Sequence, residues 1–140
     1  MSINIYYDKI DFRLKGWRKI KKLIEKVISD EKKATGDLNF ILTDDITLKK
    51  MNVKFLKHNY FTDVISFDYG VGKRMNGEIY ISIDTVKRNA LNYKVSYNSE
   101  LVRVMLHGVL HLCGYKDKSF EEKNEMNRLE DSWLKRLEEI

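Results

Sequence analysis

The chain has 140 residues, 43% of them hydrophobic and 34% charged, with a net charge of +5. This composition is typical of a soluble globular protein of one domain, which we expect to cover residues 1–140. An uninterrupted apolar run long enough for a transmembrane helix is missing, and so are the basic and apolar segments of a signal peptide. The single cysteine, Cys113, excludes an internal disulfide and fits a cytoplasmic location.

The basic residues are unevenly distributed. Residues 1–57 carry 14 lysines and arginines against 8 acidic residues, whereas residues 58–140 carry 12 against 13. A basic half favours a polyanionic partner such as nucleic acid. A solvated, lysine-rich helix face explains the same counts, so charge alone leaves both interpretations open.

The first half of the chain predicts two strands and two helices, over residues 3–7, 15–33, 38–43 and 45–56. The helix over 15–33 is apolar on one face and basic on the other, where it carries Arg18 and Lys22. In the helix over 45–56, the buried side is expected to consist of Leu48, Met51 and Phe55.

The second half predicts two strands, over 63–67 and 78–83, joined by a hairpin-like connection, and then three helices. Asp84 and Thr85 are expected to cap the first helix, which runs to about Tyr93. The second, over 99–113, is apolar nearly all round and is therefore expected at the centre of the protein. Gly114 can end it, and the last helix begins at a capping box formed by Ser119 and Glu122.

This order of elements predicts an α+β fold. We expect a mixed four-stranded sheet packed with about five helices, one of them central and buried.

Two of the three histidines lie four residues apart on that central helix. His107 and His111 therefore project from the same face, one turn apart. Burying two imidazoles among apolar side chains is costly unless each has a partner, and an i, i+4 pair is a standard way to hold zinc. Asp117 follows after Gly114, so a turn at the glycine would fold its carboxylate back towards the imidazoles.

Three protein ligands would leave a fourth position for water, as in catalytic zinc sites. The alternative is that both histidines are hydrogen-bonded core residues and that Asp117 is a surface turn residue. The His-to-His spacing also occurs in zinc peptidases, where a glutamate follows the first histidine as general base. Gly108 occupies that position here, which argues against proteolysis.

The segment over 107–115, which reads HGVLHLCGY, resembles the signature of the YbeY family of bacterial rRNA maturation factors. The segment over 62–67, TDVISF, and the segment over 77–79, GEI, are similar to further family motifs. The likeness spans about residues 36–134 in consistent order and spacing.

The resemblance implies a zinc-dependent endoribonuclease, specific for single strands, that acts in 16S rRNA 3′-end processing and ribosome quality control. It implies RNA and the ribosome or its proteins as partners, and His107, His111 and Asp117 as metal ligands that activate water. We further expect RNA contacts from Lys54, Lys57, Arg18 and Lys22, and supporting roles for Asp63, Ser66 and Glu100.

The chain departs from the family pattern at two positions. Asp117 stands where the family usually has a third histidine, and Leu56 stands where it usually has an arginine. A carboxylate ligand makes zinc a weaker Lewis acid, and a nearby lysine cannot reproduce the two-pronged hydrogen bonding of arginine. These departures favour a second interpretation, a ribosome assembly factor without catalysis in which zinc only stabilises the central helix.

Overall fold

The computed structural model describes residues 2–56 and 62–139. Within these ranges the chain forms, in order, β1 (Ser2–Tyr7), α1 (Trp17–Asp30), β2 (Ala34–Thr43), α2 (Asp45–Leu56), β3 (Val64–Asp68), β4 (Arg74–Ser82), α3 (Ile83–Tyr93), α4 (Tyr97–Leu112) and α5 (Phe120–Glu139). The predicted α+β fold, with a four-stranded mixed sheet and five helices, is confirmed. Lys57 lies outside the described residues.

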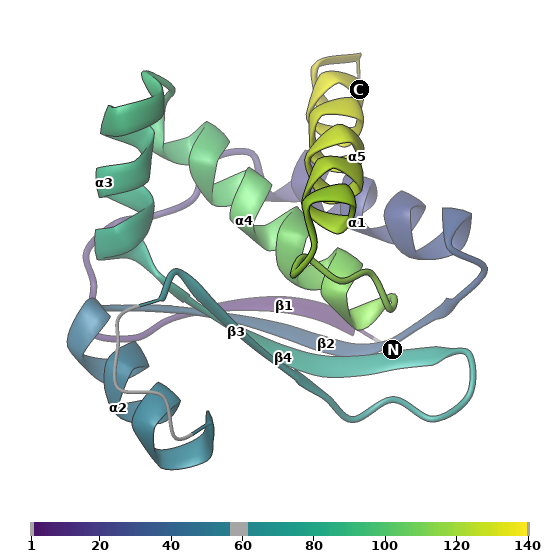
Figure 1. Ribbon diagram of the computed structural model, residues 1–140, viewed down its shortest axis with the longest axis horizontal. Helices are drawn as coiled ribbons and strands as arrows, with labels where there is room; N and C mark the ends of the chain where they lie inside the picture. The colour runs from purple at the N-terminus through teal and green to yellow at the C-terminus, as the bar shows by residue number, and fades with distance from the viewer. Residues whose placement is uncertain (1, 57–61, 140) are drawn as a thin grey trace.

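The sheet has the strand order β1-β2-β4-β3. β1 and β4 both run parallel to β2, and β3 pairs antiparallel with β4 along one edge. In Figure 1, α1, α3, α4 and α5 lie above the sheet, and α2 lies below its left end. Among the described helices, none is both long and apolar enough to span a membrane.

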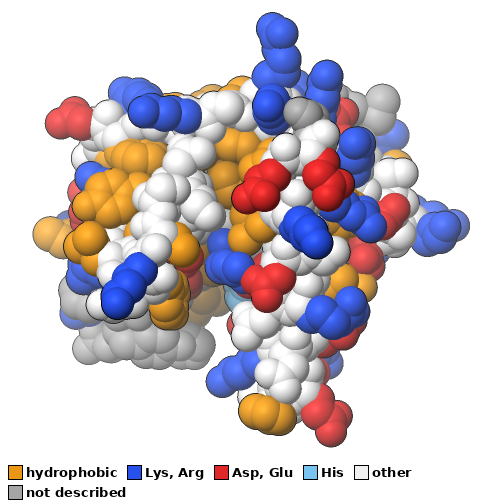
Figure 2. Space-filling view, turned by 90° about the horizontal axis from the view of Figure 1, so that it is seen from above, with side chains coloured by type: hydrophobic (Ala, Val, Ile, Leu, Met, Phe, Trp, Pro, Cys, Tyr) orange, Lys and Arg blue, Asp and Glu red, His pale blue; other side chains and the backbone are white. Residues whose placement is uncertain are grey.

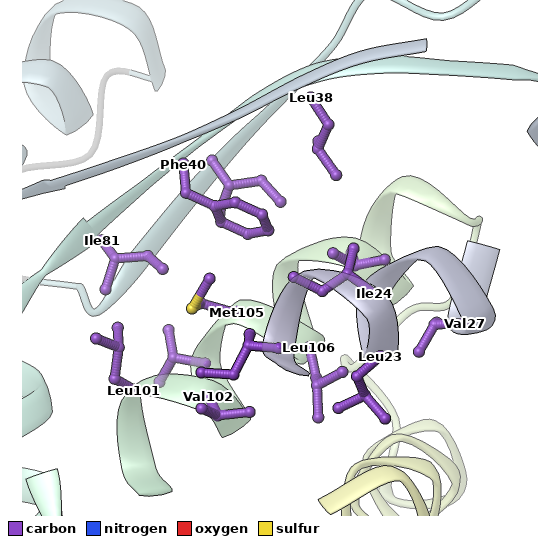
Figure 3. Packing of buried hydrophobic residues seen from close by; sticks show 14 of the residues in the cluster. Leu23, Ile24, Val27, Leu38, Phe40, Ile81, Leu101, Val102, Met105 and Leu106 are labelled. Atoms are coloured by element: carbon purple, nitrogen blue, oxygen red, sulfur yellow. The ribbon is translucent and has the colours of Figure 1, made fainter. Parts of the chain in front are cut away.

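The core lies between the upper face of the sheet and the helices α1 and α4. Alternate residues of β2 and β4 point to this face because side chains alternate along a strand. Figure 3 shows these side chains meeting those of α1 and α4. The buried residues labelled there are Leu23, Ile24, Val27, Leu38, Phe40, Ile81, Leu101, Val102, Met105 and Leu106. Each large side chain buried in this way contributes roughly 1.5–3 kcal/mol, so α4 is held firmly in place.

Gly108 allows α4 to approach the sheet closely. A Cβ at this position would lie 2.8 Å from Cγ2 of Ile79 on β4. The peptidase glutamate considered above would therefore collide with the sheet if it stood at residue 108. The packing of α4 thus explains a glycine that the sequence pattern alone left unexplained.

Two predicted details are wrong. The N-cap of α3 is Ser82, whose Oγ accepts a hydrogen bond from the Thr85 amide at 3.3 Å, whereas Asp84 lies in the first turn. In α2, Leu48 is buried as predicted, but Met51 is only partly buried, Phe55 is exposed, and the second buried residue is Asn52. α2 covers the lower face of the sheet, so a different side of the helix is shielded from solvent.

Candidate metal centre

The C-terminal half of α4 carries His107 and His111 on one face. Their rings are nearly perpendicular, with centroids 4.5 Å apart. Both side chains are partly exposed, at 24% and 29%, although the residues on either side of each are mostly buried. The helix therefore presents two imidazoles at the surface of an otherwise apolar element.

The chain reverses direction at Gly114, which has a φ of 109°. The Gly114 amide donates to the carbonyl of His111, and the Tyr115 amide donates to the carbonyl of Leu110, at 3.0 and 3.1 Å. This pair of bonds is the Schellman motif that commonly ends a helix at a glycine. It turns the backbone so that Asp117 comes back alongside the two histidines.

Three potential ligand atoms converge at this turn. Nε2 of His107 and Nε2 of His111 lie 2.9 Å apart, and Oδ2 of Asp117 lies 3.1 and 3.3 Å from them. Across the described residues, this is the one group of three histidine, cysteine or acidic side chains whose ligand atoms come this close together. The structure thus brings together the three residues that the sequence suggested as ligands.

The outer nitrogen of each imidazole has its own acceptor. Nδ1 of His107 lies 2.7 Å from Oε2 of Glu130, and Nδ1 of His111 lies 2.9 Å from the carbonyl oxygen of Tyr115. A carbonyl oxygen only accepts, so Nδ1 of His111 donates to it. In a neutral imidazole, the lone pair then belongs to Nε2.

These hydrogen bonds direct two nitrogen lone pairs and one carboxylate oxygen at the same point. Three acceptors this close repel one another unless a cation lies among them. Neutral imidazoles with a proton on Nδ1, each held by an outer acceptor, form the usual arrangement around a bound zinc. The donor set therefore fits a zinc ion, with His107, His111 and Asp117 as the residues that would hold it.

The electrostatics of His107 also favour a cation. Burial by itself lowers the pKa of this imidazole, but the hydrogen bond and negative charge of Glu130, together with Asp117 and Asp63, raise the pKa above its ordinary value. The same negative surroundings would stabilise a metal ion at Nε2.

Glu130 was not recognised from the sequence. It is only 3% exposed, and its second oxygen, Oε1, accepts a hydrogen bond from Arg103 at 3.1 Å. The signal that could have found it is its place in α5: Met126, Glu130 and Trp133 are the buried residues of that helix. A charged residue within such an apolar stripe needs a partner, and here the partners are His107 and Arg103.

The three predicted supporting residues come from two segments of the chain, one around β3 and one near the start of α4. Asp63 immediately precedes β3, and burial raises the pKa of its carboxyl. Ser66 lies on β3, facing Gly108. Glu100 lies near the start of α4 and is 4% exposed. Within the described parts of the chain, none of the three forms a side-chain hydrogen bond with His107, His111 or Asp117.

Two cavities meet at His107. The first, of about 410 Å³ and called here the metal cavity, contains the three candidate ligands and is bordered by Leu56 and Ser66. The second, of about 590 Å³ and called here the helix cavity, lies between α3, α4 and α5. Asp63 and His107 line both. Figure 2 shows a small histidine surface at the bottom of the hollow between the left part of the molecule and the charged α5 side on the right.

The predicted RNA-contact residues that the structure describes, Arg18, Lys22 and Lys54, line neither of these cavities. Arg18 and Lys22 are exposed on α1, and Lys54 lies near the end of α2, two residues before Leu56. Lys54 lines a separate shallow groove on α2 with two other lysines and two apolar residues. Of the three, Lys54 is therefore the one closest in sequence to the border of the metal cavity.

The model of the family described as Endoribonuclease YbeY matches residues 3–138. This chain belongs to the YbeY family. The resemblance found in the sequence is thus confirmed, and the family signature over 107–115 corresponds to the end of α4 and its Schellman turn.

Individual relatives support the same assignment. The chain is 46% identical over 127 residues to a protein of Flavobacterium psychrophilum named Endoribonuclease YbeY, covering 91% of each chain. It is also 46% identical over 132 residues to the Karelsulcia muelleri protein of the same name, covering 94% of this chain and 93% of the other. A solution structure of a Thermotoga maritima protein superposes with a TM-score of 0.64 at 27% identity, covering 97% of this chain and 89% of that one.

Proposed function

We propose that this chain is a zinc-dependent endoribonuclease that cuts single-stranded RNA in the cytoplasm. Its role would be in rRNA maturation at the 3′ end of 16S rRNA and in ribosome quality control, with residues 1–140 acting as one metallohydrolase domain. The observation that carries the proposal is the convergence of Nε2 of His107, Nε2 of His111 and Oδ2 of Asp117. Membership of the YbeY family supports RNA as the substrate.

A zinc ion, when bound, supplies Lewis acidity to a phosphoryl oxygen and lowers the pKa of water to about 7. The chain's own residues prepare the site for it. Glu130 and the Tyr115 carbonyl orient the two imidazoles, and the turn at Gly114 fixes the Asp117 carboxylate beside them. Asp63 and Ser66, on the border of the metal cavity, would position the substrate.

RNA binding would depend on basic side chains around this cavity. Contacts between lysine or arginine and phosphates supply affinity that falls with added salt. Lys54, near the end of α2, would contact the phosphates nearest the metal cavity. Lys57, which lies outside the described residues, remains a proposed RNA contact from the sequence alone. Arg18 and Lys22 would contact a longer RNA over the surface of α1.

A second candidate function is a ribosome assembly factor in which zinc is structural. The groove on α2 favours it, because Ile46 and Val53 are 65% and 45% exposed there and three lysines accompany them. Apolar surface with basic residues around it suits binding to a ribonucleoprotein surface. Leu56, which stands where the family usually has an arginine, also favours the assembly factor.

Metal content and single-stranded RNA cleavage, measured on the same protein samples, test both candidates. The variants are His111→Ala and Asp117→Ala, with Lys116→Ala as the matched control because it is an exposed residue of the same turn. One zinc per chain in wild type and control, with metal and cleavage both lost in the two ligand variants, supports the nuclease.

Two other results contradict parts of the proposal. If Asp117→Ala keeps full zinc content, the three-ligand site is wrong. If wild type binds one zinc and its cleavage equals that of His111→Ala, the nuclease fails and the assembly factor becomes the better candidate.

A further inference from the structure

The helix cavity has no role in the proposed chemistry, although it shares His107 with the metal cavity. Its volume of about 590 Å³ lies within the range of small-molecule sites. Residues of α3, α4 and α5 surround it, so three segments of the chain form one concave surface directly beside the candidate ligands.

The side chain of Glu100 lines this cavity and has no hydrogen-bonding partner among the described residues. The residue is 96% buried, since only 4% of its surface is exposed. Its carboxyl group forms no hydrogen bond or ion pair with any described residue, and the nearby Arg103 is already paired with Glu130 and Asp131. Among the described residues, no fully buried side-chain oxygen lacks a partner, so the unpaired carboxyl oxygens of Glu100 are open to the cavity although the rest of the residue is buried. Such a group is suited to accept hydrogen bonds from a ligand that enters the cavity.

The pKa of Glu100 is consistent with this position. Burial is the largest cause that raises it, to about 7, and the charges of Asp63 and Glu130 add to the effect while Arg103 opposes it. A ligand that donates hydrogen bonds to the ionised carboxylate would reverse this penalty.

Two exposed residues of the cavity lining offer apolar surface, one of them aromatic. Tyr93, at the end of α3, lines the cavity and is 64% exposed, and Val95 beside it is 44% exposed. Exposed aromatic rings next to a nucleic-acid-cleaving site are suited to stack unpaired bases. These two residues thus offer a flat apolar contact, and the cavity wall offers a hydrogen-bond acceptor.

The charge of the lining excludes a phosphate as the natural occupant. Four acidic side chains and one arginine line the helix cavity: Asp63, Glu100, Glu130, Asp131 and Arg103. A phosphodiester would be repelled, whereas an uncharged base that presents N–H groups would be attracted. On the Watson–Crick edge of an unpaired guanine, N1–H and N2–H are two adjacent donors, which match the two oxygens of one carboxylate.

We propose that the helix cavity is a nucleobase subsite for a guanine next to the phosphodiester that is cut, with its donor edge bound by Glu100 and its ring stacked on Tyr93. The proposal rests on the proposed function for its substrate class, RNA. Because the two cavities share Asp63 and His107, a base bound in the helix cavity would lie next to the candidate metal ligands.

Binding of free nucleosides tests this subsite without phosphate and without cleavage. Guanosine, adenosine, cytidine and uridine are titrated into the full chain with its metal, and amide chemical shifts are followed by NMR. We expect guanosine to bind about tenfold more tightly than the other three, the discrimination of one good bidentate contact. Glu100→Gln should abolish this preference, because its amide presents a donor where the carboxylate presents an acceptor.

A second variant keeps the test valid if the buried substitution perturbs folding. Tyr93→Ala should weaken binding of all four nucleosides about fivefold or more, as expected for loss of base stacking. Leu91→Ala is the matched control, because Leu91 is 68% exposed on the same helix and does not line the cavity. It should leave binding unchanged.

Three results would overturn the proposal: equal affinity for the four nucleosides, guanosine binding that survives both variants, or shifts around the cavity caused by Mg²⁺ and by none of the nucleosides. The proposed nuclease is tested separately. Guanosine binding without RNA cleavage keeps the subsite and removes the nuclease, whereas zinc-dependent cleavage without a base preference does the reverse.

Discussion

Replacing Glu100 by glutamine should stabilise the protein at alkaline pH and leave its stability nearly unchanged at acid pH. The pKa of this carboxyl is raised from 4.5 to about 7, first by burial. Below pH 4.5 the group is protonated in the folded and the unfolded chain, so it carries no charge penalty. Between pH 4.5 and 7 the unfolded chain releases the proton first, so the free energy of unfolding of the wild type falls as pH rises.

The magnitude follows from this difference in pKa. Each pH unit corresponds to about 1.4 kcal/mol, so the full difference between 4.5 and 7 corresponds to roughly 3 kcal/mol. The carboxyl group faces the open helix cavity, where water screens its charge, so we expect about half of this value. Glu100→Gln should therefore raise the free energy of unfolding by about 1–2 kcal/mol at pH 8 and by much less at pH 5.

Urea unfolding of the metal-free protein, followed by circular dichroism at pH 5 and pH 8, measures this difference. Glu138→Gln is the matched control, since Glu138 is an exposed glutamate near the end of α5. It should change stability equally at both pH values. The argument fails if Glu100→Gln has the same effect at pH 5 as at pH 8, because the charge on Glu100 would then carry no penalty.

Three further substitutions test the surroundings of the site. Glu130→Gln should weaken zinc binding about 10–100-fold in a chelator competition, because it replaces the charged acceptor of the His107 Nδ1 proton by a neutral amide. Unchanged affinity would mean that the charge of Glu130 does not support the site. Gly108→Ala should destabilise the fold by about 1–3 kcal/mol in thermal unfolding, since its Cβ would lie 2.8 Å from Ile79; an unchanged melting temperature would mean that α4 shifts freely. Ser119→Ala should lower the free energy of unfolding by about 1 kcal/mol in thermal unfolding, because Ser119 Oγ would no longer accept the hydrogen bond from the Glu122 amide. A loss near zero would mean that this hydrogen bond does not stabilise the start of α5.

Features that depend on neighbouring residues were predicted well. The capping box that starts α5 is present, with Ser119 and Glu122 each accepting a hydrogen bond from the other's amide. The end of α4 at Gly114 is equally local, because a glycine relieves the strain of a positive φ. The N-cap of α3 was predicted wrongly because it depends on residues far apart in the sequence. The choice between Ser82 and Asp84 depends on where β4 leaves the sheet, and this is decided by pairing with β2.

The buried side of α2 was also predicted only in part, because it depends on long-range packing. Its apolar residues do not form one clear stripe, so the sequence offered Phe55 as a core residue. In the structure, Phe55 packs edge-on against Phe67 with ring centroids 5.8 Å apart, on the face of the sheet away from the main core. Which face of the sheet receives a helix is a property of the whole fold.

By itself the sequence determined the elements, the α+β class and the juxtaposition of His107, His111 and Asp117, because helix periodicity and a glycine turn act over a few residues. Only the tertiary structure decided what surrounds them. Glu130 contacts His107 although the two residues are 23 positions apart in the sequence. The cavity that exposes the Glu100 carboxyl exists only where α3, α4 and α5 meet. Such contacts depend on how distant elements pack against one another, and short-range sequence patterns do not predict that packing.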